Sequence, residues 1–94
     1  MPLTLNQALR VNENVLIQDL GGESVLLNLD SEQYFGLDDI GTDMLSMLKE
    51  SLSIQATYDR LLQKYDVEPQ QLQQDLLELV EQLVEHGLVQ VAEA

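Results

Sequence analysis

The sequence has no cysteine, one histidine, and only four lysine and arginine residues in a chain of 94. Without cysteine the protein has no disulfide framework and no thiolate that could act as a nucleophile or metal ligand. A single histidine leaves little to hold zinc or to relay protons, so we predict no metal, no other cofactor and no catalysis. These absences disfavour most classes of enzyme.

Long apolar runs are also missing. No run approaches the roughly 20 residues that a membrane-spanning helix needs. The first residues, MPLTLN, do not form a basic segment followed by an apolar one, as a secretory signal would. We therefore expect a cytoplasmic protein that does not insert into a membrane.

Negative charge is present in excess. Seventeen aspartate and glutamate residues give a formal net charge of −13 at pH 7. Such a field repels DNA and RNA, so nucleic acid is not an expected partner. The length suits one compact domain.

The first third of the chain has the alternation typical of β-strands. Runs at 15–20 and 24–30 flank Gly21-Gly22, which supplies the positive-φ positions of a tight hairpin turn. The second run places Val25, Leu27 and Leu29 on one face of its strand. A polar turn then leads to the segment 33–37, so we predict a three-stranded antiparallel meander.

From residue 38 onward the apolar spacing is helical, and it predicts three helices. Their boundaries are marked by residues typical of helix ends, which are Asp38 or Asp39, Ser53, Pro69 and Gly87. The third helix, from about residue 69 to 86, is the longest, and 88–91 is a short extended tail. The predicted fold class is α+β, with the sheet before the helices.

The segment before the first predicted strand is less regular. Within residues 1–14, the stretch 9–11 could add a short edge piece to the sheet or lie across it.

The third predicted helix carries more apolar surface than one packing face uses. At 100° per residue its apolar arc is about 160° wide, whereas a stripe of about 100° suffices to cover a core. Two neighbours in the core could share this arc, or part of it could remain an open groove for a partner.

The strand at 33–37 ends the meander and therefore has a free edge. It contains neither lysine nor proline, which natural proteins use to block such edges. Gly36 would let another backbone approach closely, or would mark a bulge or a bend. A strand added at this edge and packed against the third helix would be β-augmentation.

Two segments, VLLNLDSEQYFGLDDIGTDML and YDVEPQQLQQDLLELVEQLVEHGLV, carry a recognisable pattern. It comprises Leu-Leu-Asn at a strand end, Tyr-Phe-Gly-Leu, Ile-Gly at the first helix, Tyr-Asp-Val before the third, and a closing His-Gly-Leu-Val. In order and spacing the chain resembles the PqqD-like family. The resemblance covers residues 15–91, which we expect to form one domain after the segment 1–14 and before the tail 92–94.

The resemblance implies a winged helix-turn-helix fold that recognises the leader segment of a ribosomally made precursor peptide. Such a domain binds the leader as a fourth strand on its third strand, facing its third helix. It then delivers the precursor to a modifying enzyme or leader peptidase and is not itself an enzyme. Tyr-Phe-Gly-Leu and Ile-Gly look most similar to the stand-alone leader-binding proteins of lasso-peptide pathways.

Carried over by position, the peptide-binding residues lie on the third strand and the third helix. They are Gln33, Tyr34, Phe35, Gly36, Leu37, Leu72, Asp75, Leu76, Leu79 and Leu83. Asp75 could receive a basic side chain or a backbone amide of the leader, or could be a solvated surface carboxylate. Tyr34 and Phe35 alternate, so one of them faces the helices, and the sequence does not decide which.

An alternative function is an acidic interaction or regulatory module that docks on a folded partner through the apolar face of the third helix. DNA binding is disfavoured because residues 68–86 carry acidic side chains and no lysine or arginine. His86 is expected to interact with the carbonyl end of its helix rather than to catalyse a reaction. The chain is expected to be a monomer, or a dimer paired through the strand at 33–37.

Overall fold

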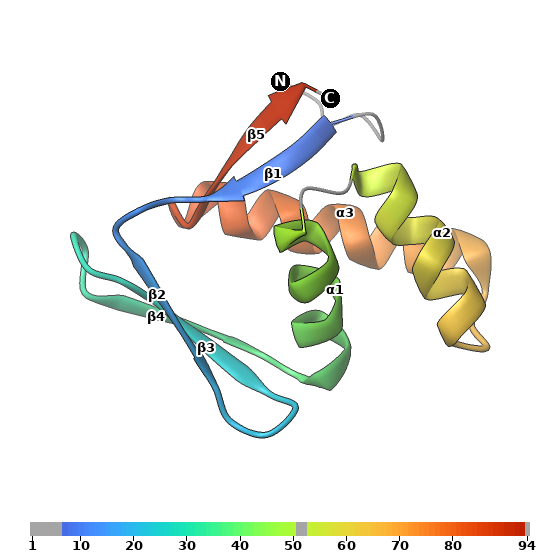
Figure 1. Ribbon diagram of the computed structural model, residues 1–94, viewed down its shortest axis with the longest axis horizontal. Helices are drawn as coiled ribbons and strands as arrows, with labels where there is room; N and C mark the ends of the chain where they lie inside the picture. The colour runs from blue at the N-terminus through green and yellow to red at the C-terminus, as the bar shows by residue number, and fades with distance from the viewer. Residues whose placement is uncertain (1–6, 51–52, 94) are drawn as a thin grey trace.

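The computed structural model describes residues 7–50 and 53–93 and shows an α+β fold of three helices and two small antiparallel sheets (Figure 1). In chain order the elements are β1 (Gln7–Val11), β2 (Val15–Asp19), β3 (Ser24–Asn28), β4 (Gln33–Leu37), α1 (Asp39–Lys49), α2 (Ile54–Lys64), α3 (Pro69–Glu85) and β5 (Val89–Glu93). The predicted α+β class is confirmed. Within the described ranges, no helix is long and apolar enough to cross a lipid bilayer.

The larger sheet is the predicted meander, with strand order β2-β3-β4. Gly21 and Gly22 connect β2 to β3 with φ of 80° and 107°, which is the positive-φ geometry that the sequence predicted. The register between β3 and β4 runs one-to-one from Asn28 opposite Gln33 to Ser24 opposite Leu37. Pairing without an extra residue means that Gly36 does not mark a bulge.

One face of this sheet packs on the helices. Leu26 and Leu37 are buried on that face, and Val15, Ile17 and Phe35 pack against the core beside them. Val25, Leu27 and Leu29, which the sequence placed on one face, lie on the opposite side of β3, where Leu29 is exposed.

A second, two-stranded sheet was not predicted from the sequence. Gln7–Val11 forms β1 and pairs antiparallel with β5, Val89–Glu93, so that Leu9 lies opposite Val91. The suggestion that residues 9–11 add an edge to the meander is wrong, because their partner strand comes from the other end of the chain.

The helices begin and end near the predicted cap residues. The Asp38 carboxylate accepts the Gly41 N–H at 2.8 Å, and the Ser53 hydroxyl accepts the Ala56 N–H at 3.1 Å. Pro69 occupies the first turn of α3, and Gly87 follows that helix with φ of 68°. Side-chain acceptors at the N-termini of α1 and α2 and the left-handed glycine after α3 satisfy backbone groups that these helices leave free.

The core lies between the inner face of the meander, the helices and β5. Its fully buried members come from every layer, and among the largest are Leu26, Leu48, Ile54, Leu61, Leu76, Leu83 and Leu88. The wide apolar arc of α3 is therefore mostly shared between its neighbours in the core.

Candidate functional site

Strand β4 has hydrogen-bonded pairing on one side only. It pairs with β3, and among residues 7–50 and 53–93 no strand lies along its other edge. At Gly36 an added Cβ would meet no atom within 4 Å, so the fold itself does not require glycine there. The edge is free, regular and unprotected by lysine or proline.

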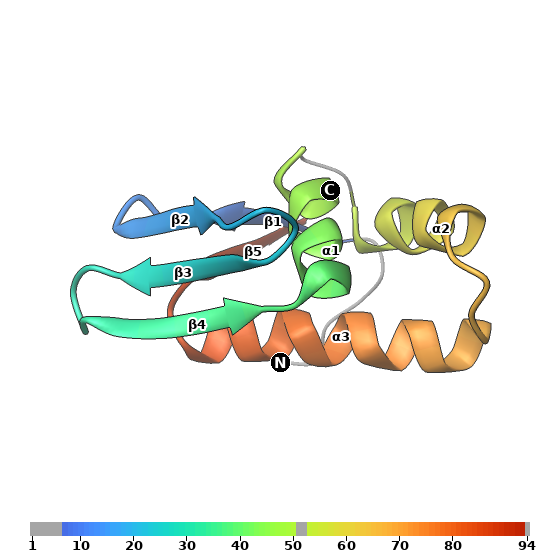
Figure 2. The ribbon, with the colours of Figure 1, turned by 90° about the horizontal axis from the view of Figure 1, so that it is seen from below.

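A groove of about 490 Å³ lies beside this edge. Figure 2 shows β4 running alongside α3, with the beginning of α1 at one end of the strand. The groove is lined from all three elements by Phe35, Gly36, Leu37, Asp38, Ile40, Gly41, Met44, Asp75, Leu79 and Gln82. Its volume is in the range of protein clefts that accept ligands.

Apolar side chains form much of the groove wall. Met44 and Leu79 are almost completely buried, whereas Ile40 in the first turn of α1 is 40% exposed. Phe35 is half-buried and packs against the core. An extended segment laid along β4 would therefore bury apolar surface of Ile40 that is now exposed to water.

Polar groups complete the groove. The Asp75 carboxylate accepts a hydrogen bond from Gln71 Nε2 at 2.8 Å and is exposed, so it retains acceptor capacity for a ligand. The Asp38 carboxylate is engaged in capping α1. Gln82, about two helical turns after Asp75 on α3, adds a side-chain amide. The groove thus offers hydrogen-bond acceptors and negative charge next to an apolar wall.

The structure decides between Tyr34 and Phe35. Phe35 faces the helices, with its ring centroid 5.1 Å from that of His86, whereas Tyr34 points to the other side of the sheet and is 73% exposed. His86 Nδ1 lies 2.7 Å from the Gln82 carbonyl oxygen, so the imidazole is held against the last turn of α3. These contacts give His86 a structural position at the helix end.

The predicted helical wall is only partly at the groove. Asp75 and Leu79 line it, but Leu72, Leu76 and Leu83 have 5%, 0% and 0% exposure and lie in the core. Their side chains face the packed interior because they occupy the middle of the apolar arc, while the groove lies at its edge.

Five lining residues were not predicted as site residues: Asp38, Ile40, Gly41, Met44 and Gln82. Gln82 could have been predicted, because it is seven residues after Asp75 and therefore lies within about 20° of Asp75 around the helix axis. Ile40 could have been inferred from its place just after the free strand and its helix cap.

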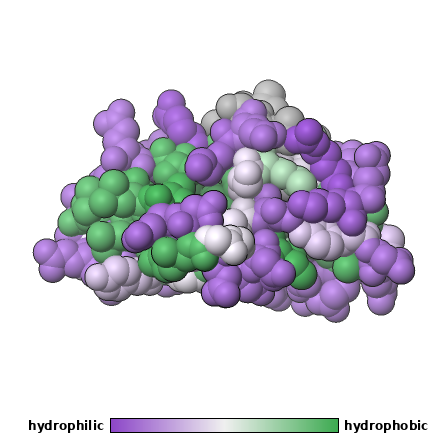
Figure 3. Space-filling model, turned by 60° about the horizontal axis from the view of Figure 1, so that its bottom comes forward, coloured by the Kyte–Doolittle hydropathy of each residue, from purple (hydrophilic) through white to green (hydrophobic). Residues whose placement is uncertain are grey.

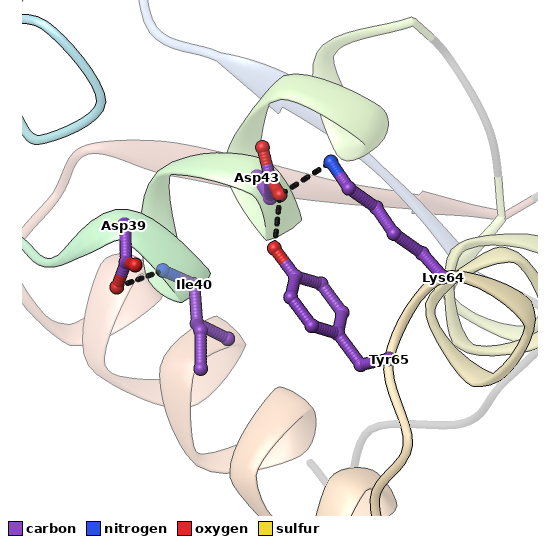
Figure 4. Close-up of polar contacts among 5 residues, drawn as sticks. All are labelled: Asp39, Ile40, Asp43, Lys64 and Tyr65. Atoms are coloured by element: carbon purple, nitrogen blue, oxygen red, sulfur yellow. Dashed lines mark hydrogen bonds and ion pairs between the residues drawn. The ribbon is translucent and has the colours of Figure 1, made fainter.

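A separate polar cluster joins α1 to the end of α2 (Figure 4). The Asp43 carboxylate accepts hydrogen bonds from Lys64 Nζ at 2.7 Å and from the Tyr65 hydroxyl. These bonds, the one from Lys64 above all, lower the pKa of Asp43 below its ordinary value. The bond to Asp43 likewise raises the pKa of Lys64 and that of Tyr65. The cluster does not line the groove and serves to hold two helices together.

In the part of the chain that the structure describes, no three histidine, aspartate or glutamate side chains gather in a set that could hold a metal ion.

The chain is similar to proteins of known structure. Residues 23–89 match the family model described as coenzyme PQQ synthesis protein D (PqqD). The structure "TbiB1 in Complex with the TbiA(beta) Leader Peptide" is 27% identical, with a TM-score of 0.81 over 86% of this chain and 94% of that one. "Lasso peptide synthetase B1 complexed with the leader peptide" is 24% identical, with a TM-score of 0.80 over 87% and 96%. None of the curated proteins compared with the chain is a match.

Proposed function

The chain belongs to the PqqD family, and from this premise we propose that it binds the leader segment of a ribosomally made precursor peptide. The leader pairs as an added strand with the free edge of β4, and the chain delivers it to a modifying enzyme or leader peptidase without acting as a catalyst. The observation that carries the proposal is the unpaired, regular edge of β4 directly beside an apolar groove. Two similar solved chains are described as complexes with leader peptides.

Backbone pairing would supply much of the affinity. Residues 33–37 offer N–H and C=O groups along an edge that has no partner in the described chain. An extended peptide that joins them exchanges water for main-chain hydrogen bonds, and its alternate side chains point into the groove.

The groove would supply specificity. Every second leader residue faces Phe35, Leu79 and Ile40, so apolar side chains are favoured there. A lysine, an arginine or a backbone amide can be received by Asp75. The net charge of −13 also favours encounter with a basic segment.

The remaining predicted residues act indirectly in this proposal. Gln33 and Tyr34 contribute backbone contacts, the Tyr34 side chain lies on the face of β4 away from the groove, and Leu37 anchors the end of β4 in the core. Leu72, Leu76 and Leu83 hold α3 at the position that forms the groove wall.

Within the α+β fold, we assign a winged helix-turn-helix arrangement in which the β3–β4 hairpin is the wing. The use is not DNA binding, because α3 (Pro69–Glu85) has no lysine or arginine to meet phosphates. We assign the chain to the stand-alone leader binders of lasso-peptide pathways, and its structural similarity to a lasso peptide synthetase B1 in complex with a leader peptide supports this assignment.

The test is a two-dimensional NMR titration of labelled chain with the leader of whichever short precursor peptide is encoded beside it, and with a scrambled leader as control. We expect saturable shifts confined to residues 33–37, Ile40, Asp75, Leu79 and Gln82, and none with the scrambled peptide. Shifts centred instead on Leu77 and Val84, which are partly exposed on α3, would favour the folded-partner alternative. A dimer paired through β4, detected by sedimentation, would leave the edge occupied and contradict the proposal.

A further inference from the structure

The meander carries apolar side chains on both of its faces. The inner face packs on the core, as described above. The other face, which we call the outer face, carries Leu16, Leu20, Val25, Leu27, Leu29 and Tyr34. An antiparallel sheet with one face in water normally alternates apolar and polar residues, so a doubly apolar sheet is typical of one that is covered on both sides.

The register shows that these side chains are neighbours. Leu16 lies opposite Leu27, and Leu27 lies opposite Tyr34, which gives one apolar row across all three strands. Leu20 and Leu29 lie just beyond the ends of their strands, and antiparallel hydrogen bonds extend the pairing to them, so their side chains also lie on the outer face. Leu20 N–H donates to Glu23 O at 2.7 Å, and Leu29 N–H donates to Asn14 O at 2.8 Å.

The outer face is open to solvent. Leu16 and Leu20 are each 56% exposed, Leu29 is 48% exposed, and Tyr34 is 73% exposed. Figure 3 shows hydrophobic side chains gathered over the end of the molecule that the strands occupy. Grouped exposure of this kind marks interaction surfaces more often than scattered apolar residues do.

The charges around the outer face decide which occupant fits. From residue 12 to residue 38 the chain has no lysine or arginine, and its charged residues are Glu13, Asp19, Glu23, Asp30, Glu32 and Asp38. All six are exposed. Two basic residues of other elements lie near them, because Arg10 shares a pocket with Glu13 and Asp30, and Lys49 shares one with Asp19. With six acidic and two basic residues the rim remains acidic. A second copy would bring the same acidic rim against this one, and like charges across an interface oppose association.

We propose that the outer face docks a different protein, one that presents an apolar β-sheet face with lysine and arginine side chains around it. Two such faces pack with their strands nearly aligned and their side chains interdigitated. The basic side chains of the partner then meet the acidic rim.

This surface is distinct from the leader groove. Phe35 and Leu37 face the helices, whereas Tyr34 faces away, so the two sites use opposite faces of β4. A leader strand on β4 would add a fourth strand to the outer face, and its outward side chains would lie next to Tyr34. The docked partner would therefore contact the leader as well as this chain.

The size of the face indicates a transient complex. Five-residue strands are about 17 Å long, and three of them are about 14 Å wide. The face therefore measures about 240 Å². A standard interface buries roughly 800 Å² per partner, so the acidic rim and the leader must also contribute to binding.

The experiment compares a double variant of the outer face, Leu16→Glu with Leu29→Glu, with a matched control, Val67→Glu with Gln63→Glu. Val67 is 41% exposed and Gln63 is exposed, and both lie outside the sheet and outside α3. The probes are the purified modifying enzyme and the purified leader peptidase encoded with the chain, a choice that rests on the proposed function. Biolayer interferometry measures the affinity of each probe, with and without leader, and fluorescence anisotropy measures leader affinity separately.

We expect the outer-face variant to bind one of the probes at least tenfold more weakly than the control variant does, with unchanged leader affinity. Two results overturn the inference without affecting the proposal of leader binding. Either both variants bind the probes with equal affinity, or the unmodified chain binds neither probe. A dimer of the unmodified chain that Leu16→Glu disperses also overturns it, because the occupant would then be a second copy. Failure of the unmodified chain to bind leader counts against the proposed function instead.

Discussion

Replacing Ile40 by glutamate tests the groove with little risk to the fold. Ile40 is 40% exposed, and burying a whole isoleucine side chain contributes about 1.5–3 kcal/mol, so a leader that covers it gains about 0.6–1.2 kcal/mol. Ile40→Ala should therefore weaken leader binding about three- to sevenfold. Ile40→Glu should weaken it at least about tenfold, because the leader would also have to cover a carboxylate at a cost of about 1–3 kcal/mol.

The control for this experiment is Val67→Glu, since Val67 is 41% exposed and lies between α2 and α3, outside the groove. Both variants add one negative charge, so general electrostatic effects cancel in the comparison. Ile40 is 40% exposed, so by the same measure its buried part contributes about 0.9–1.8 kcal/mol to folding. Loss of this contribution in Ile40→Glu is partly offset because an acidic side chain suits the N-terminus of α1, and urea unfolding measures the net change. Fluorescence anisotropy with labelled leader gives the affinities. Equal affinities for Ile40→Glu and Val67→Glu, with both proteins folded, would refute the location of the site.

Three further substitutions distinguish a residue of the groove from residues that stabilise the fold. Asp75→Asn should weaken binding of a leader that carries lysine or arginine and should reduce the dependence of that affinity on salt. The control Glu78→Gln removes a carboxylate that is also bonded to a glutamine but lies outside the groove, and it should have neither effect. Titrations of leader into both variants at low and high salt measure the difference. Leu76→Ala should destabilise the fold by about 2–5 kcal/mol in urea unfolding, because this fully buried side chain would leave a cavity; a stability loss below about 1 kcal/mol would place it outside the core. Since the folded pKa of Asp43 is lowered, its contribution to stability is present above the unfolded pKa and is lost as the pH falls through the folded value. The stability difference between the unmodified chain and Asp43→Asn should therefore be larger at pH 7 than at pH 2 in urea unfolding, and a constant difference would contradict the assignment.

Local signals made much of the fold predictable. The glycine pair in the hairpin, the caps at Asp38 and Ser53, and the left-handed Gly87 each act on a few neighbouring residues, so sequence alone locates them. The limits of β4 were predicted for the same reason, because a polar turn precedes it and a helix cap follows it.

The β1–β5 pairing could not be predicted in this way. Gln7 and Glu93 are opposite each other although nearly the whole chain separates them. No local pattern links two short strands at such a separation, and the cost of closing the loop is met only by the complete fold.

The composition of the groove wall was also only partly predictable. An apolar arc shows that Leu76 and Leu79 share one side of α3, but it does not show which of them the neighbouring elements cover. The position of α1 decides this, and it also brings Ile40 to the groove. The resemblance to a family pointed to β4 and α3, and the packing determines which of their residues line the groove.

Because β1 pairs with β5, the two ends of the described chain lie side by side, on the far side of α1 from β4 (Figure 1). A domain whose ends meet can be inserted into a loop of another protein, or circularly permuted through a short linker, without stretching its core. Such a host would leave the β4 edge and the outer face accessible. The fold is thus suited to use as an exchangeable cassette, either alone or within a larger enzyme.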